Sequence, residues 1–242
     1  MKNIIFIAPP AAGKGTQSTM LKDKYNYNHL STGDMLREAI ASGSTLGLKV
    51  KNIIDRGELV SDDIMIDLIK DKLSSESGKP FILDGFPRTL NQAKSLDNML
   101  DDDYVVIYLD LGEEEATNRI VNRLTCKCGK SYNLNIANLK PKVDGICDVC
   151  GSELIKRNDD NLESFKIRYN SFLENTKPLI EYYDNKNKRN RQIDLTHVHD
   201  GKKPHTHHGY YHDENGTTRL TSEERKMVDR VKRIWYNRNS KK

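Results

Sequence analysis

Apolar segments long enough to span a membrane are missing from this chain of 242 residues. Its opening, MKNIIFIAPP, has too short an apolar core for a secretion signal and lacks a small-residue cleavage pattern. Cysteine is also scarce, and all four cysteines lie between positions 126 and 150. These absences argue against a membrane or secreted protein. We therefore expect a cytoplasmic location, with cysteines that bind metal rather than form disulfides.

A strong charge of one sign is missing as well, since the net charge is only +4. The surplus is confined to residues 197–242, which hold eleven Lys/Arg against six Asp/Glu and also six of the seven histidines. The remaining residues are nearly neutral, as in an ordinary soluble enzyme. The length suits one main domain with an appendage. We accordingly divide the chain into a domain over 1–195 and an atypical His-rich, basic extension over 196–242.

Strand and helix patterns alternate along the domain. Apolar runs predict strands over 3–8, 80–84, 104–111 and 191–195. Helical patterns cover 13–25, 34–42, 45–57, 61–76, 89–100, 113–124 and a long stretch over 161–183. The segment 125–157 breaks this rhythm with Cys, Gly, Asn and Pro. Strands that alternate with helices predict an α/β fold with a parallel sheet, which binds ligands at the carboxyl ends of its strands.

The stretch FIAPPAAGKGTQ (6–17) resembles a phosphate-binding loop between a strand and a helix. Such a loop presents backbone N–H groups at a helix N-terminus, and its lysine adds positive charge. The sequence departs from the usual pattern, because Ala8 replaces the first glycine and Gly15 follows Lys14 where a hydroxyl residue is usual. Alanine in place of glycine at positions 8 and 11 is the smallest departure that keeps a Cβ. Taken alone, the stretch could also be a strand–helix junction with a surface lysine.

Further motifs follow in a fixed order. They are LSTGDMLR (30–37), GELV (57–60) and LDGFPRTLNQ (83–92), with Arg119, Arg123, Arg157 and Arg168 after them. As an ordered set over residues 1–185 they resemble an adenylate kinase of the long-lid bacterial type. The resemblance implies a P-loop three-layer α/β fold with a helical NMP-binding insert at about 31–60 and a cysteine-containing lid at about 123–160. It also implies Mg²⁺-dependent transfer of a phosphoryl group from ATP to AMP, giving two ADP.

The resemblance also implies which residues form the site. Arginine suits this chemistry because its planar guanidinium contacts two phosphate oxygens at once. The residues implied to bind ATP are Ala11, Ala12, Gly13, Lys14, Gly15, Thr16, Arg119, Arg123, Ser131 and Tyr132. Those implied to bind AMP are Thr32, Arg37, Glu58, Leu59, Val60, Gly85, Phe86, Pro87, Arg88, Gln92, Arg157 and Arg168. Those implied to act in catalysis are Lys14, Arg88, Arg123, Arg157 and Arg168.

Carboxylates have implied roles too. Asp84 would orient the water shell of Mg²⁺, with Asp34 as a weaker candidate. Asp159 and Asp160 would fix lid arginines rather than act as bases. No strong general base is expected, because the attacking phosphate oxygen is already an anion.

The acceptor base is suggested by two positions. Related UMP/CMP kinases usually carry Ala before the Gly-Asp pair and Asn in the helix after GFPR, whereas this chain has Thr32 and Gln92. A glutamine side chain can both donate to and accept from one adenine edge. AMP is therefore the expected acceptor. A kinase for UMP or CMP is one alternative, and a weakened kinase with a metal- or nucleic-acid-binding tail is another.

The four cysteines form two pairs inside the expected lid. Cys147 and Cys150 have the spacing of a zinc knuckle, while Cys126 and Cys128 are one residue closer than usual. Four thiolates would close the coordination shell, so we expect a structural zinc ion. Reduced thiols in a zinc-free lid, or a free-standing zinc ribbon for nucleic acid, are the alternatives.

After Leu195 the sequence departs from the family pattern, which usually continues with a glycine turn and a last amphipathic helix. A helix is predicted over 221–237, where apolar residues recur at helical spacing. We expect it to pack on the domain or to remain a peripheral extension, while nucleic-acid or partner binding through its basic face is less favoured. We expect a monomer whose partners are nucleotides, without membrane contact.

Overall fold

The computed structural model describes residues 2–75, 78–100, 104–186, 190–194 and 205–208, and its centre is a sheet of six strands. The strand order is β2 (Asn28–Ser31), β3 (Phe81–Asp84), β1 (Asn3–Ile7), β4 (Tyr104–Asp110), β7 (Asn190–Asp194) and β8 (His205–His208). The first five strands are parallel, and β8 pairs with β7 in the antiparallel sense. The predicted α/β class with a parallel sheet is confirmed.

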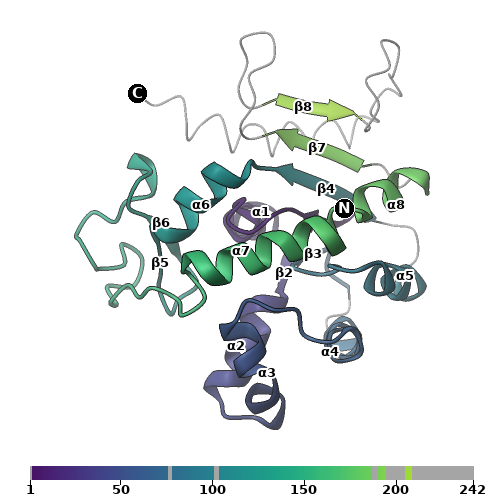
Figure 1. Ribbon diagram of the computed structural model, residues 1–242, viewed down its shortest axis with the longest axis horizontal. Helices are drawn as coiled ribbons and strands as arrows, with labels where there is room; N and C mark the ends of the chain where they lie inside the picture. The colour runs from purple at the N-terminus through teal and green to yellow at the C-terminus, as the bar shows by residue number, and fades with distance from the viewer. Residues whose placement is uncertain (1, 76–77, 101–103, 187–189, 195–204, 209–242) are drawn as a thin grey trace.

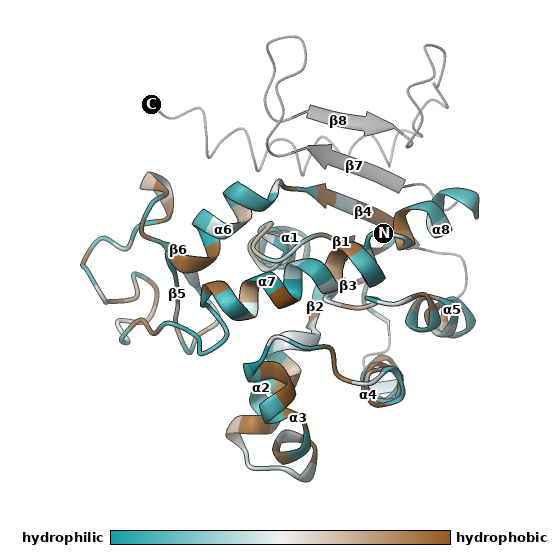
Figure 2. Ribbon diagram, in the orientation of Figure 1, coloured by the Kyte–Doolittle hydropathy of each residue, from teal (hydrophilic) through white to brown (hydrophobic). Residues whose placement is uncertain are grey.

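Helices cover both faces of the sheet (Figure 1). Ile4 and Phe6 of β1 belong to a core with α1 (Lys14–Tyr25), α6 (Glu113–Val121) and α7 (Leu162–Ser171). Ile5 and Ile7 belong to the opposite core with α5 (Leu90–Met99) and α8 (Leu179–Asn185). Successive residues of a strand point to opposite faces, so a continuous apolar run fills both cores. Figure 2 shows the result as a largely brown β4 between helices that carry both teal and brown residues.

Two smaller units project from this body (Figure 1). One contains α2 (Thr32–Ala41) and α3 (Thr45–Asp55), which leave the end of β2 and return through α4 (Asp62–Ser75). The other holds the hairpin of β5 (Arg123–Thr125) and β6 (Ser131–Asn133), followed by a short 3₁₀ turn, Ala137–Leu139. Residues of both units line one cavity together with the loop after β1 and the end of β3, so the two units flank the carboxyl edge of the sheet.

The long helix predicted over 161–183 is interrupted. A π-helical turn, η2 (Phe172–Thr176), separates α7 from α8, and the Lys177 amide donates to the Phe172 carbonyl at 2.8 Å. Pro178 has no N–H to continue the α-helical pattern, which explains a break that spacing alone did not reveal. The strands β2 and β8 were also not predicted, since NHLS and HTHH are too polar to be recognised as strands.

The chain end is described only in part. β7 confirms the strand predicted near 191–195, and β8 places the backbone of 205–208 beside it. The helix predicted over 221–237 and the rest of the extension lie outside the described residues. Among the helices of the described ranges, none combines the length and apolar character needed to cross a bilayer.

A largely buried carboxylate joins three elements on the α5–α8 side. Asp97 of α5 accepts hydrogen bonds from the hydroxyl of Tyr104 in β4, from the Tyr182 hydroxyl at 2.7 Å and from Lys186 Nζ at 2.7 Å. Burial alone would raise the pKa of Asp97, but hydrogen bonds from Lys186 and the two tyrosines outweigh it and hold the pKa below its ordinary value of 3.8. The charged form is therefore the one that the fold stabilises.

Replacing this carboxylate should give a pH-dependent loss of stability. A carboxyl whose pKa is depressed by folding contributes stability above its unfolded pKa, and that contribution disappears as pH falls through the folded value. Asp97→Asn should lower the free energy of unfolding by about 2 kcal/mol at pH 7, and the difference should shrink below about pH 4. Urea unfolding at several pH values measures this, with the exposed Asp67→Asn on α4 as control. A difference that stays constant from pH 7 to pH 3 would contradict the assignment.

Candidate active site

One cavity of about 870 Å³ opens at the carboxyl edge of the sheet, between the α2–α3 unit and the β5–β6 unit. It is lined by the loop after β1, the end of β3, the 57–60 segment and the arginines of α6, α7 and the β5–β6 unit. Of the residues expected to bind ATP or AMP, only Phe86 is absent from the lining, because its side chain is fully buried in the core. Motifs as far apart in sequence as Lys14 and Arg168 thus meet around one space.

The loop after β1 positions Lys14 at the N-terminus of α1. Its Nζ donates to the carbonyls of Ala8 at 3.1 Å and Pro9 at 3.2 Å, and burial lowers the Lys14 pKa to about 8, with nearby Asp84 opposing that shift. Ala11 has a φ of 62°, a left-handed conformation that costs a residue with a Cβ about 1–2 kcal/mol. The alanine for glycine exchange therefore preserves the loop conformation at a cost in strain.

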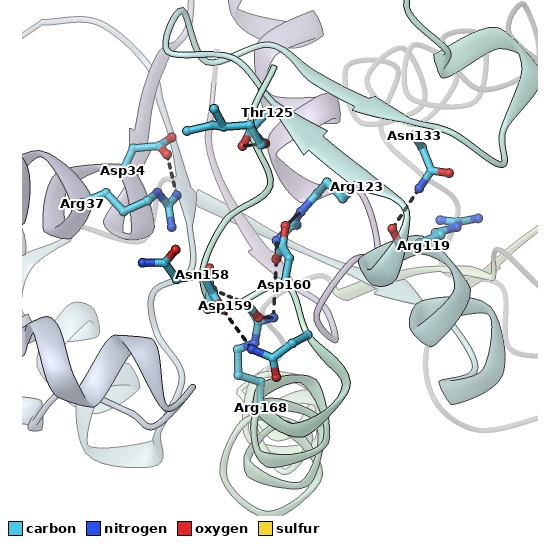
Figure 3. Close-up of polar contacts among 12 residues, drawn as sticks. Asp34, Arg37, Arg119, Arg123, Thr125, Asn133, Asn158, Asp159, Asp160 and Arg168 are labelled. Atoms are coloured by element: carbon cyan, nitrogen blue, oxygen red, sulfur yellow. Dashed lines mark hydrogen bonds and ion pairs between the residues drawn. The ribbon is translucent and has the colours of Figure 1, made fainter. Parts of the chain in front are cut away.

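Two carboxylates hold arginines at the cavity (Figure 3). Arg123 contacts Asp160 through both Nε, at 2.8 Å, and Nη2, and the Asp160 carboxylate has no exposed surface. Arg168 donates from Nη1 to Asp159 Oδ2 at 2.6 Å and from Nη2 to the Asp159 carbonyl. The expected role of the two aspartates, to fix arginines, agrees with these contacts.

The cationic groups are short of counter-charge. Burial, together with Arg123 and Arg37 nearby, lowers the pKa of Arg157 to about 10. Burial likewise lowers the pKa of Arg88 and of Arg168. Arg168 also has a buried Nε without a hydrogen-bond partner in the described part of the chain. Desolvated cations with unused donors are suited to bind an anion with several oxygens, such as a phosphate group.

The end of β3 is tightly packed around Gly85. Its φ is +90°, and a Cβ at this position would lie 2.6 Å from the Thr32 hydroxyl and 3.1 Å from Arg88 Nη2. Glycine is therefore needed both for the turn and for the close approach of Arg88. Arg88 Nε donates to the Gly85 carbonyl at 2.9 Å, so the turn itself orients the guanidinium. Pro87 and Gln92 line the same part of the cavity.

Some contacts at the site were not predicted. His29 Nε2 lies 3.2 Å from Asp84 Oδ2, and both side chains are mostly buried. The position of His29 near the end of a strand that precedes STGD was the available signal, but β2 itself was not recognised.

Asp34, expected as a weaker Mg²⁺ candidate, is paired with Arg37 at 2.6 Å. Glu58 pairs with Arg56 at 2.8 Å on the exposed surface.

The four cysteines converge in the β5–β6 unit. All four sulfurs lie within 4.8 Å of one another, with Cys126 and Cys150 at 3.3 Å and Cys128 and Cys147 at 3.7 Å. Thiolates bound at about 2.3 Å around a tetrahedral zinc ion would lie just under 4 Å apart. A turn at Gly129, with a φ of +87°, brings Cys128 close despite the shortened first spacing. The donor set and its size therefore fit zinc.

A tyrosine supports this cluster from inside the unit. Tyr132 is buried with Cys126, Cys147 and Leu154, and its hydroxyl accepts from the Asp148 amide at 2.7 Å. The same hydroxyl lies 3.4 Å from Cys147 Sγ, and this hydrogen bond is the main reason why the Cys147 pKa falls to about 6. Tyr132, expected at the ATP site, thus also packs beneath the cysteine cluster.

Fold and site together define a P-loop protein that binds phosphate groups in a cationic cavity. The sequence profile of the family described as Adenylate kinase matches residues 6–188. An Adenylate kinase of Thermosipho africanus is 53% identical over 193 residues, which cover 77% of this chain and 89% of that protein. The Adenylate kinase of Archaeoglobus fulgidus is 48% identical over 190 residues (76% and 87%), and that of Clostridium tetani 41% over 191 residues (76% and 88%). The chain belongs to the adenylate kinase family.

The buried Asp160 carboxylate allows a test of how the arginines are held. Asp160→Asn keeps the volume but leaves Arg123 without its charged partner, which should lower the free energy of unfolding by about 3 kcal/mol. Urea denaturation at neutral pH measures the loss. Asp144→Asn, an exposed change in the same unit, is the matched control and should stay within about 0.5 kcal/mol of the parent. If the two variants were equally stable, the Arg123–Asp160 ion pair would not stabilise the β5–β6 unit.

Proposed function

We propose that the chain is an adenylate kinase that transfers the terminal phosphoryl group of Mg²⁺-bound ATP to AMP, reversibly, with two ADP as products. The observation that carries this is a shared cavity whose lining includes both the phosphate loop and the side chains of Arg88 and Gln92. A cavity with such a lining can bring donor and acceptor phosphates together. The family membership supports the same conclusion.

The cationic residues divide between the two nucleotides. Lys14 and the amides of residues 11–16 would bind the ATP phosphates at the start of α1, with Arg119 beside them. Arg37 and Arg88 would bind the AMP phosphate. The residues that would surround the transferred group are Arg123, Arg157 and Arg168.

These residues supply position and charge rather than covalent chemistry. The attacking AMP phosphate oxygen is an anion and needs no base, so the barrier falls when the arginines and Lys14 stabilise the charge of the transferred group. Arg168 Nε has no hydrogen-bond partner among the described residues, so the protein alone does not fully satisfy this guanidinium. Closure of the β5–β6 unit over the cavity would exclude water and so prevent ATP hydrolysis.

Asp84 fits the expected contact with the magnesium shell. A Cβ on Gly15 would lie only 3.5 Å from Asp84 Oδ2, so the carboxylate stands directly beside the phosphate loop. When bound, Mg²⁺ neutralises the phosphate oxygens and orients them. Asp84 would accept hydrogen bonds from its water ligands, while His29 steadies the carboxylate from the other side.

The AMP base would lie against Thr32, Gln92 and the 58–60 segment, where Leu59 and Val60 supply apolar contact. The enzyme would act as a monomer, because the described residues of one chain supply both parts of the cavity lining. The extension over 196–242 would stay peripheral to the reaction.

The direct test is ADP formation from ATP with AMP, CMP, UMP or GMP as acceptor. We expect strong selectivity for AMP. Arg88→Ala should lower kcat/KM by at least about a hundredfold, because it removes a half-buried guanidinium that is proposed to bind the acceptor phosphate. Lys70→Ala, which removes an exposed cationic side chain outside the cavity lining, serves as control. Near-normal turnover of the Arg88 variant would refute its role, and no activity of the parent with any acceptor would refute the proposed function.

We also propose that Cys126, Cys128, Cys147 and Cys150 bind one structural zinc ion. The small core of this unit (Cys126, Tyr132, Cys147 and Leu154) contains two of the ligands, so the ion would complete a fold that has few apolar residues. With all four positions filled by thiolates, the ion would have no site for a substrate.

Removal of one cysteine ligand should show whether the zinc ion supports the stability of the lid rather than the phosphoryl transfer. Cys150→Ser should reduce zinc content well below about one ion per chain and lower the thermal stability of the lid, with a smaller effect on turnover. Elemental analysis and thermal unfolding measure these changes. The matched control is Val143→Ser, an exposed apolar residue in the same unit. Unchanged zinc content in the Cys150 variant would refute ligation.

A further inference from the structure

We propose that Asp62 is a specificity-determining residue: it fixes the Gln92 amide in the one orientation that adenine can pair with, and so excludes 6-oxopurine monophosphates. The inference rests on the proposed function and concerns how its acceptor base is chosen. Asp62 does not line the cavity, whereas Gln92 does. Asp62 would therefore be a positioning residue that acts through Gln92.

Both ends of the Gln92 amide have defined partners. Its Oε1 accepts from the Arg88 backbone N–H at 2.8 Å, and its Nε2 donates to Asp62 Oδ1 at 2.8 Å. The other oxygen of Asp62 accepts from the Thr89 hydroxyl at 2.8 Å. That hydroxyl in turn accepts from the backbone N–H of Gln92 and so caps α5. The side chain is only 2% exposed, so it has little access to water as a substitute partner.

These partners permit one orientation of the amide. A backbone N–H can only donate and a carboxylate can only accept. If Gln92 were turned over, Nε2 would face the Arg88 N–H and Oε1 would face the Asp62 carboxylate. A donor would then face a donor at one end of the amide, and an acceptor would face an acceptor at the other end. In a buried site this arrangement costs far more than a lost hydrogen bond at the surface.

The fixed amide leaves one N–H on Nε2 and one lone pair on Oε1 for a ligand. Adenine matches this pattern, because its 6-amino group donates and its N1 accepts. A 6-oxopurine has the reverse pattern, with an accepting O6 and a donating N1–H. Hypoxanthine would therefore require the orientation that Asp62 and Arg88 forbid. A site that leaves buried polar groups unpaired rejects such analogues strongly.

Asp62→Asn tests this with little change of volume. An asparagine amide can turn, so it can accept from Gln92 Nε2 or donate to Gln92 Oε1, and the constraint at this end is removed. The assay compares kcat/KM for AMP and IMP, which differ only at this edge of the base. We expect the preference for AMP over IMP to fall at least about tenfold, with a higher KM for AMP and a gain with IMP, while the KM for ATP changes less than about twofold.

Asp63→Asn is the matched control, because it removes the same charge from the first turn of the same helix but is exposed. It should leave the AMP to IMP ratio unchanged. If Asp62→Asn does not unfold cooperatively, Asp62→Ser replaces it, since its hydroxyl can also donate or accept and suits a helix start.

The outcomes distinguish the inference from the proposed function. A parent enzyme without AMP-dependent ADP formation refutes the proposed function itself. A parent that strongly prefers AMP, with the same AMP to IMP ratio in the Asp62 variants, overturns the inference alone. A proportional loss with AMP and IMP also overturns it, because Asp62 would then support the fold rather than the selectivity.

Discussion

The cost of burying positive charge without its ligand governs the arrangement of this protein. Lys14, Arg88, Arg157 and Arg168 all have pKa values lowered mainly by desolvation, so the free enzyme holds cations in an environment that disfavours them. A nucleotide phosphate bound among these groups would relieve that cost. The fold must keep these groups apart and oriented until the phosphate arrives, and the surrounding structure serves that need.

Three carboxylates hold the cationic side chains in place without neutralising all of their charge. Asp160, fully buried, contacts both Arg123 and Arg168, while Asp159 binds Arg168. Asp84 opposes the pKa shift of Lys14 from the end of β3 and is itself held by His29. Each carboxylate comes from the carboxyl edge of the sheet or the loop before α7, so the parallel topology and the return of α7 across that edge bring the counter-charges together.

The sequence predicted the parts of this site that follow from local chemistry. The phosphate loop was recognisable from Gly13 to Thr16 although Ala8 and Ala11 replace glycines, because the helix start and the lysine remain. The cysteine pairs were recognisable by spacing. What could not be predicted depends on tertiary contact: His29 lies on a polar strand, the π turn arises where Pro178 meets a packed helix, and Asp62 gains its role only through Gln92, 30 residues away.

Recognition of the phosphate and recognition of the base would therefore rest on different interactions, namely charge for the phosphate and the direction of hydrogen bonds for the base. Phosphate binding would draw on charge that many residues share, and Ala11 keeps a left-handed backbone, with a φ of 62°, at a local cost in strain. Base recognition depends on the direction of single hydrogen bonds. The orientation of an amide such as that of Gln92 is fixed only when one of its neighbours can only donate and the other can only accept. Arg88 would belong to both systems: its guanidinium, which the Gly85 carbonyl orients, is proposed to bind the acceptor phosphate, while its backbone N–H donates to Gln92. A shift of the Gly85–Arg88 turn would thus disturb the acceptor phosphate and the acceptor base together, which couples the choice of base to the placement of the atom that attacks.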